Sequence, residues 1–473
     1  MIWHIAKREI YDNLNSLRFA LATVLLIALM LTNAVVHLRE HPKRFQEYRD
    51  AVIEGQNILK SDATDSLYKL AEQGPGYLYK TPSLLRFCAD GGEHFLPDSV
   101  QAGYHRWGAT DLESFWILAY PPVIPNSRNV RTDVPKVDWG FIIGYILSLV
   151  TLLFTFDAVS SERERGTLRL TLANSVPRHT VLIGKFLGAL ISINIPFTLA
   201  VLMNLLLIST SSDVYLAPET WSRLGIIYLI ALLYTCLFLA LGLLVSARVQ
   251  RSAVSLVILL LVWVIFVVFM PSTLASIAGG FSSPMSSDEF RERSEQLDDV
   301  IDELWDKYYV PWDDTPEDLI KKIQLGSEIV TKDAAQQERL HEEFLQQQVS
   351  QMNRARAIIR ISPVSIVQHL LESFAGTGFE RHLQFLENVQ FYAQQFRIFI
   401  ADTDNADPES LHIFGVREGM SQKPVNPEAI PKFEDTLDLS KDFNTVATEL
   451  LLLTLFVVVL LSGAYLAFVR VEV

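Results

Sequence analysis

Long apolar runs alternate with polar segments along the chain, and half of all residues are hydrophobic. Six of the runs hold roughly the 20 apolar residues that a helix needs to cross a bilayer. These runs cover residues 19–38, 139–157, 181–208, 224–246, 252–271 and 447–470. The third run exceeds one membrane thickness, so we expect it to tilt, kink or continue past the bilayer. The pattern predicts a mainly α-helical, polytopic protein that crosses a lipid bilayer six times.

The chain before the first run, residues 1–18, has its own periodicity. Its apolar side chains recur at helical spacing: Ile2, Ile5, Ala6, Ile10, Leu14 and Leu17. Charged side chains, including the basic pair Lys7-Arg8, occupy the other faces. Such a helix is typical of the membrane interface. A plain cytoplasmic tail is the alternative.

Two polar insertions separate the runs. In the first, residues 39–138, helical spacing continues to about residue 72, and short aromatic stretches broken by Pro and Gly follow. These stretches predict short strands or irregular packing, so the insertion is of mixed type. Four aromatic residues are expected to supply a small core: Trp107, Phe115, Trp116 and Tyr120.

The second insertion, residues 272–446, is predicted to be mainly helical. Its opening segment is small and weakly apolar, which predicts a re-entrant or interfacial turn after Pro271. Amphipathic periodicity then predicts four helices, followed by a loop at 401–440. The helices cover Asp288–Tyr309, Pro316–Ile361, Pro363–Gly376 and Phe379–Ile400.

Charge gives these segments an orientation. Residues 272–446 hold 31 acidic and 16 basic side chains, an excess of acid as large as that of the whole chain. Arginines gather instead in the short segments, including residues 158–180 with Arg163, Arg165, Arg169 and Arg178. The positive-inside rule therefore predicts cytoplasmic termini and two extracytoplasmic insertions. No uniformly basic face is present, which argues against a nucleic-acid partner.

Polar residues interrupt two of the spans. In the third, Asn194, Pro196 and Asn204 are candidates for a substrate path, because polar groups and kinks within spans often mark one. Packing between helices is the alternative use of the asparagines. In the first span, Asn33 is expected either to bond to a neighbouring span or to sit at the far interface.

Motifs for catalysis are missing from the sequence. No GxxxxGK[ST] phosphate loop occurs, since Gly184-Lys185 lacks both the preceding glycine and the following hydroxyl, so we expect no ATP hydrolysis by this chain. No histidines show a metal-ligand spacing, and no metal site or bound cofactor is expected. An acidic run at residues 298–306 is most simply a solvated helix face.

The segment 158–180 is the tip of a hairpin formed by the second and third spans. Glu162, Arg163 and Glu164 offer charges for docking a soluble partner, and Leu168 is expected to seat the tip in the interface. The pair Gly166-Thr167 indicates a turn or a close approach. A short charged helix held by two spans acts as a lever on both. An inert loop with ordinary topogenic arginines is the alternative.

These residues carry a resemblance to a known family. The order Glu162, Gly166-Thr167-Leu168, Pro177-Arg178 and Gly184-Lys185 resembles the signature of ABC-2 type permeases, the type-2 membrane subunits of ATP-binding-cassette transporters. The family spacing is Pro-x-x-Arg, whereas here Arg178 follows Pro177 directly. The large insertions, with the stretch from Ser362 to Gly378, resemble a bacterial subgroup of the family.

The resemblance implies an export permease of the bacterial cytoplasmic membrane. A cytoplasmic ATPase dimer, which binds the ATP and Mg²⁺, would dock on residues 162–168, the coupling helix. A second permease chain, identical or sibling, would complete the unit. Two alternatives stay open: mechanical work on a periplasmic or surface partner without solute transport, and a membrane enzyme or sensor with an external ligand domain.

Overall fold

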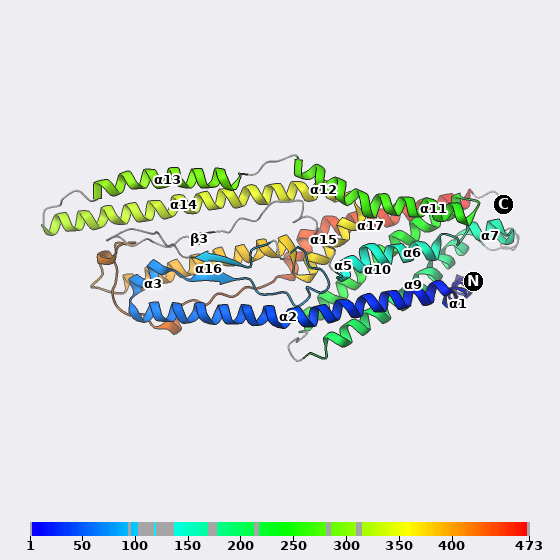
Figure 1. Cartoon of the computed structure of the whole chain (residues 1–473), viewed down its shortest axis with the longest axis horizontal. Coiled ribbons are helices and arrows are strands. Elements are labelled where there is room, and N and C mark those ends of the chain that lie inside the picture. Colours follow the sequence, from blue (N-terminus) through cyan, green and yellow to red (C-terminus); the bar gives the residue numbers. More distant parts are fainter. Residues whose placement is uncertain are drawn as a thin grey trace.

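The computed structural model describes residues 2–92, 96–102, 118–119, 137–168, 177–211, 217–280, 285–308 and 315–470. The four aromatic residues proposed as a core of the first insertion (Trp107, Phe115, Trp116 and Tyr120), and also Arg169, lie outside the described residues. The molecule is a long body, with its first and last described residues near one end (Figure 1).

Helices dominate the described chain. The first half contains α1 (Ile2–Leu14), α2 (Leu17–Asp65), α3 (Leu67–Gln73), β1 (Gly76–Tyr79), β2 (Ser99–Ala102), β3 (Leu118–Ala119), α5 (Trp139–Phe141), a π-helical turn (Ile142–Leu147), α6 (Ser148–Thr155), α7 (Ser160–Glu164), α9 (Arg178–Ile208) and α10 (Pro218–Arg248). The second half contains α11 (Ser252–Trp263), a π-helical turn (Val264–Phe269), α12 (Met270–Gly280), α13 (Ser287–Tyr308), α14 (Pro316–Ile359), α15 (Pro363–Ala375), α16 (Gly378–Asn405), 3₁₀ turns (Arg417–Gly419 and Pro427–Ala429) and α17 (Leu439–Val469).

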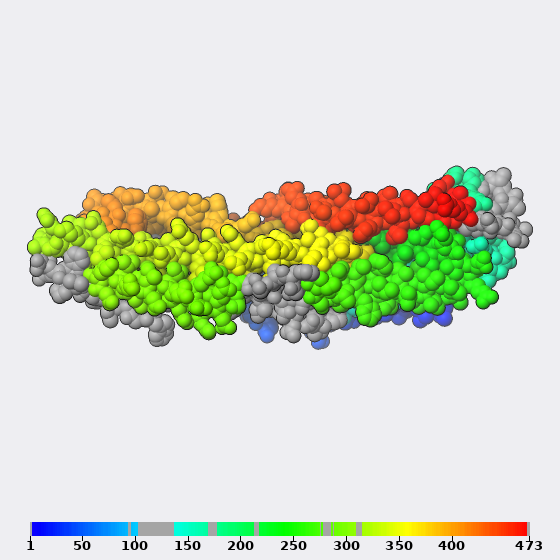
Figure 2. Space-filling view, turned by 90° about the horizontal axis from the view of Figure 1, so that it is seen from above, coloured from blue at the N-terminus to red at the C-terminus, as the bar shows by residue number. Residues whose placement is uncertain are grey.

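Among the described residues, six helical segments are long and apolar enough to cross a membrane, which agrees with the predicted number of spans. They are Leu17–Asp65, Trp139–Glu164, Arg178–Ser209, Pro218–Arg248, Ser252–Leu274 and Leu439–Val469. The short helix α7 lies at the same end as α1, while α3, α13 and the sheet lie in the other half (Figure 1). In the space-filling view, α17 follows one half of the body and α13 the other (Figure 2).

Two predicted boundaries do not appear as breaks in the helices. The first span and the polar helix expected after it are one continuous helix, α2, of 49 residues with Pro42 inside it. The interfacial or re-entrant turn expected for residues 272–284 is absent from the described part of that segment, because residues 270–280 form α12; residues 281–284 lie outside the described residues. A π-helical turn precedes Pro271, and Ser362 donates a hydrogen bond to the Phe266 carbonyl within that turn (3.3 Å). A side chain from elsewhere in the chain therefore satisfies backbone at this point.

The core of the spanning bundle is built around α10, which packs on α6, α9, α15 and α17. Close approach depends on small residues: a Cβ at Gly242 would meet the Thr155 hydroxyl of α6 at 1.9 Å. The 13-residue helix α15 is too short to span, yet it buries its apolar face in this same core. It ends at Gly376, whose φ of 64° is the left-handed conformation that favours glycine. The predicted helix from Pro363 to Gly376 is thus confirmed.

The other half of the molecule has a second core. Strands β1, β2 and β3 form an antiparallel sheet in that order, which confirms the short strands predicted for the first insertion. Apolar residues of α3, β1, β2 and α16 pack together there. The helices α13, α14 and α16 confirm the helical prediction for the second insertion. Because α16 carries side chains of this core, both insertions fold as one unit.

Candidate functional site

The predicted coupling segment contains α7, a helix of five residues between α6 and α9. Its first N–H groups have no partner within so short a helix. The Ser246 hydroxyl of α10 accepts hydrogen bonds from the N–H groups of Val159 and Ser160, both at 3.0 Å. The start of α7 is therefore fixed by a side chain of α10.

A buried lysine ties α7 to two further helices. The Nζ of Lys185, on α9, donates to Glu9 of α1 at 2.6 Å and to Glu162 of α7 at 2.8 Å. The lysine is buried, and both carboxylates keep partial contact with solvent. Two carboxylates more than compensate the one buried positive charge, and each of the three groups comes from a different helix. We call Glu9, Glu162 and Lys185 the ion triad.

Two glycines allow the ion triad to form. Gly184 and Gly188 lie one turn apart on α9, on the face that α1 covers. A Cβ at Gly184 would lie 2.8 Å from the Cβ of Ile5, and one at Gly188 would lie 2.6 Å from the Cβ of Glu9. Small residues four apart allow two helices to approach closely. The Gly-Lys pair of the sequence signature thus has a physical reason, since the glycine admits α1 and the lysine binds its carboxylate.

The far end of α7 is attached to a fourth helix. The Glu164 carboxylate accepts hydrogen bonds from the hydroxyl (2.9 Å) and the N–H (3.2 Å) of Ser252, the first residue of α11. An acidic group is stabilised at a helix N-terminus by the unpaired N–H groups and the helix dipole. Hydrogen bonds therefore join α7 directly to α9, α10 and α11, and to α1 through Lys185.

The predicted docking residues face in different directions. Glu162 points inward to the ion triad, and Leu168 is buried among apolar residues of α9, α10 and α17. Glu164, Arg165, Gly166 and Thr167 are exposed, and Arg163 is half-buried. The φ of Gly166 is positive, and a Cβ there would meet nothing within 4 Å, so this turn needs glycine for its conformation and not for space. The described tip, residues 164–167, therefore stands on an anchored base.

Ion pairs and hydrogen bonds near α7 attach the starts of α2 and α9 to neighbouring segments. Arg18, at the start of α2, pairs with Asp157 at 2.9 Å and lies over the Phe156 ring. Arg178, at the start of α9, donates to the carbonyls of Phe468 and Val469 at the end of α17. A basic side chain at a helix C-terminus satisfies carbonyls that have no partner within the helix.

The candidate substrate-path residues lie on α9 but do not meet one another. Asn204 is buried and donates to the Met30 carbonyl (2.6 Å) and to Asn33 (2.9 Å), both on α2. Asn194 donates to the carbonyl one turn earlier on its own helix. Pro196 is buried inside α9. The contacts of Asn204 favour packing between spans, and the substrate path stays a prediction. Asn33 does bond to a neighbouring span, as one of its two expected placements required.

A second polar cluster lies at the other end of the bundle. Arg223 of α10 forms an ion pair with Asp442 of α17 at 2.7 Å, and Gln384 of α16 donates to the same carboxylate at 2.7 Å. All three side chains are buried. Glu449, two turns further along α17, pairs with Arg360 at 2.7 Å. These contacts connect the spanning helices to the other half of the molecule.

Sequence reasoning found only part of this arrangement. Gly184-Lys185 was identified from the signature, but the partnership of Lys185 with Glu9 and Glu162 was not. Glu9 lies 176 residues and Glu162 23 residues from Lys185, and no local spacing links them. Ser246 and Ser252 carry no sequence signal. In the described part of the chain, no cluster of three or more His, Cys, Asp or Glu side chains could hold a metal ion.

Comparison with known proteins agrees with this architecture. The family model described as "ABC-2 family transporter protein" matches residues 3–473. The "Probable ABC transporter permease protein NosY" of Pseudomonas aeruginosa is 32% identical over 138 residues, which cover 28% of this chain and 48% of the relative. The protein of the same name from Stutzerimonas stutzeri is 31% identical over 127 residues, or 26% of this chain and 45% of the relative. The matched part spans about half the length of each relative.

Proposed function

Because the chain belongs to the ABC-2 transporter family, and is thus a multi-pass membrane subunit of an ABC transporter, we propose that it is an export permease driven by a separate cytoplasmic ATPase. The ATPase dimer binds ATP and Mg²⁺ and docks on the exposed tip that follows α7. A second permease chain, identical or sibling, completes the pore. The termini and α7 face the cytoplasm, and the two insertions lie outside the bacterial cytoplasmic membrane.

The observation that carries this proposal is the way α7 is held. Its exposed tip offers a surface to a soluble partner, while hydrogen bonds attach its base to α9, α10 and α11, and through Lys185 to α1. A push on the tip is therefore delivered to several helices at once, since packed helices move as rigid bodies. ATP-driven closure of the ATPase dimer would rock these helices and open a path outward.

A single variant pair tests the coupling. The positive φ at Gly166 disfavours any residue with a Cβ, so Gly166→Val should distort the tip. We expect the purified complex to lose substrate-stimulated ATPase activity. Gly225→Val is the matched control, because a Cβ there would meet nothing within 4 Å. Full ATP-dependent activity in Gly166→Val would contradict the coupling assignment.

One observation favours a second candidate function, mechanical work on an external partner. Helix α2 runs without a break from the end with α1 into the other half of the molecule, over 49 residues. At a helical rise of about 1.5 Å per residue, its length is roughly 74 Å. A continuous helix of this length would carry movement from the spans to the insertions. Solute flux into vesicles separates the two functions: export requires ATP-dependent flux, whereas mechanical work requires ATP turnover without it.

A further inference from the structure

A cavity of about 310 Å³ lies in the half of the molecule formed by the insertions. Residues of α2, of β1 with Pro75 just before it, of α16 and of the chain at 427–433 line it. Small-molecule sites occupy roughly 300–1,000 Å³, so this cavity is at the small end of that range. We call it the β1 cavity. It lies in the other half of the molecule from α7 and takes no part in the proposed coupling.

Part of the wall of the β1 cavity is backbone to which no described residue bonds. The N–H of Lys80 donates to Asp98 at 2.8 Å, in register with the pairing of β1 and β2. In an antiparallel pair the bonded residues alternate, so the N–H and C=O groups of Tyr77 and Tyr79 point away from β2. A Cβ on Gly55 of α2 would lie 3.9 Å from the Tyr77 carbonyl oxygen, which places that edge against α2. No described residue bonds to the outward groups of these two tyrosines.

The rest of the wall is apolar and aromatic. Val52 and Leu59 of α2, Leu78 of β1, Tyr392 of α16 and Phe433 all line the cavity. Tyr392 is buried, and its hydroxyl donates to the carbonyl of Pro431 at 3.1 Å, which fixes the segment 427–433 against α16. This wall is therefore rigid and suits an apolar side chain.

Charges of both signs line the same space. Lys60 and Lys432 are exposed, and neither forms an ion pair with a described residue. Glu428 lies on the same wall. Neither ammonium group is committed to a described carboxylate. The two lysines favour a ligand that carries a carboxylate. Glu428 favours a ligand that carries an ammonium group or another hydrogen-bond donor.

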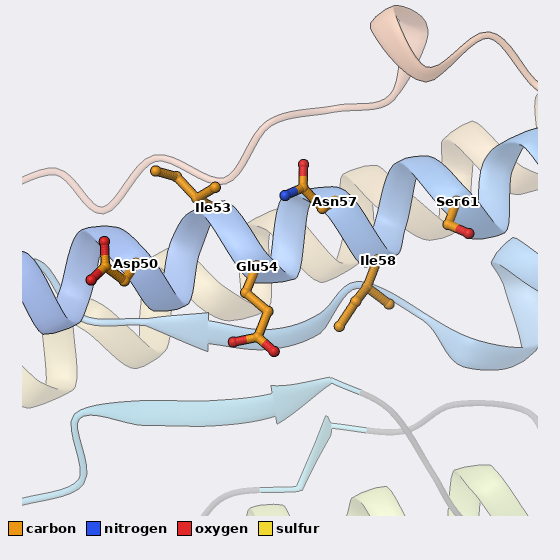
Figure 3. A pocket seen from close by; sticks show the side chains of 6 residues that line it. All are labelled: Asp50, Ile53, Glu54, Asn57, Ile58 and Ser61. Carbon is orange, nitrogen blue, oxygen red and sulfur yellow. The ribbon is translucent and has the colours of Figure 1, made fainter.

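An exposed depression on α2 differs from the β1 cavity. Asp50, Ile53, Glu54, Asn57, Ile58 and Ser61 line it, and all six come from that one helix (Figure 3). Their side chains point to different sides of the helix, and the depression has no second wall among the described residues. The depression therefore lacks what the β1 cavity has, namely facing walls with different chemistry.

From these groups together we propose that the β1 cavity binds a short peptide. The outward N–H and C=O of Tyr79, to which no described residue bonds, supply a donor and an acceptor for a peptide amide, as sheet edges do for extended peptides. The apolar wall takes one side chain, and Lys60 and Lys432 take the C-terminal carboxylate. The volume suits a di- or tripeptide and excludes a folded domain. This site would make a peptide either the transported substrate or an external signal.

The direct test is binding of L-phenylalanyl-L-phenylalanine to the whole chain in lipid nanodiscs, measured by isothermal titration calorimetry. Val52→Trp fills the cavity and should weaken binding at least about tenfold, or 1.4 kcal/mol. Ile53→Trp is the matched control, because it adds the same side chain to the neighbouring position in the open depression. It should bind as the wild type does. Thermal unfolding of both variants checks that each is folded.

Two further arms test the chemistry. The double variant Lys60→Ala/Lys432→Ala should weaken the free-acid dipeptide but not its C-terminal amide, and Lys332→Ala, an exposed lysine elsewhere, should change neither. Equal binding by Val52→Trp and Ile53→Trp, or no saturable binding to the wild type, would overturn the proposal. Free phenylalanine binding as tightly as the dipeptide would overturn it as well, since the peptide amide would then contribute nothing. None of these outcomes depends on an ATPase, so the coupling proposal is tested separately.

Discussion

Replacement of Lys185 by Met removes the charge at the centre of the ion triad and keeps the length of the side chain. Loss of one partner from a fully buried ion pair costs about 3–5 kcal/mol. Here the lysine is 4% exposed, but Glu9 and Glu162 are 25% and 31% exposed and regain some hydration. The variant also no longer loses free energy by removing a lysine ammonium from water. We therefore expect a loss of about 2–3 kcal/mol of stability.

The assay is thermal unfolding of the chain in nanodiscs, together with substrate-stimulated ATP hydrolysis by the assembled complex. We expect Lys185→Met to unfold at a lower temperature and to lose stimulation, because α7 is no longer tied to α9. Lys7→Met, at an exposed position on α1, is the matched control. Adding Glu162→Gln to Lys185→Met should recover part of the stability, since one stranded carboxylate is removed. The reasoning is refuted if Lys185→Met behaves like Lys7→Met in both measurements.

Three further predictions concern other contacts. Gly188→Val introduces a Cβ 2.6 Å from a side-chain carbon of α1 and should cost about 1–3 kcal/mol. Thermal unfolding should show a shift for this variant and none for Gly225→Val, and equal shifts would argue against tight packing of α1. Arg223→Met leaves the buried Asp442 without its cationic partner and should lower the free energy of unfolding by about 3–5 kcal/mol. The double variant Arg223→Met/Asp442→Leu should unfold at a temperature closer to that of the wild type. If the double variant is no more stable than the single one, the unpaired Asp442 carboxylate is not the cause of the lost stability. Burial raises the pKa of Glu372 from 4.5 to about 7, so the native state holds a proton that the unfolded chain releases, and stability falls as pH rises between these values. Glu372→Gln should remove this part of the pH dependence when unfolding is measured at about pH 5 and about pH 8, and an unchanged pH dependence would contradict the assignment.

Local patterns predicted much of the fold. An apolar run of about 20 residues can satisfy its backbone in lipid only as a helix, so the six spans follow from hydropathy alone. The helix from Pro363 to Gly376 was equally predictable, since Pro favours a helix start and Gly its end. Neither inference depends on what the segment contacts.

The features of the fold that local patterns did not predict depend on contacts between residues far apart in sequence. The small, weakly apolar segment after Pro271 predicted a turn, but the helix continues there. Its continuity past Pro271 depends on the π-helical turn before it and on Ser362, which lies 96 residues in sequence from the carbonyl it binds. The continuity of α2 past residue 38 likewise depends on its packing in two different environments. The ion triad joins three helices, and only the fold brings its charges together. Sequence therefore predicted a coupling segment, whereas the inward direction of Glu162 required the structure.

The central claim is that an ATPase grips the tip after α7 from the cytoplasm. The most direct measurement places a photo-crosslinking amino acid at Arg165, which is exposed, and identifies the covalent partner after irradiation of intact cells. We predict a crosslink to a protein with an ATP-binding phosphate loop, and a weaker crosslink when that protein cannot bind ATP. A crosslink to a periplasmic protein, or none to any ATPase, would contradict the account.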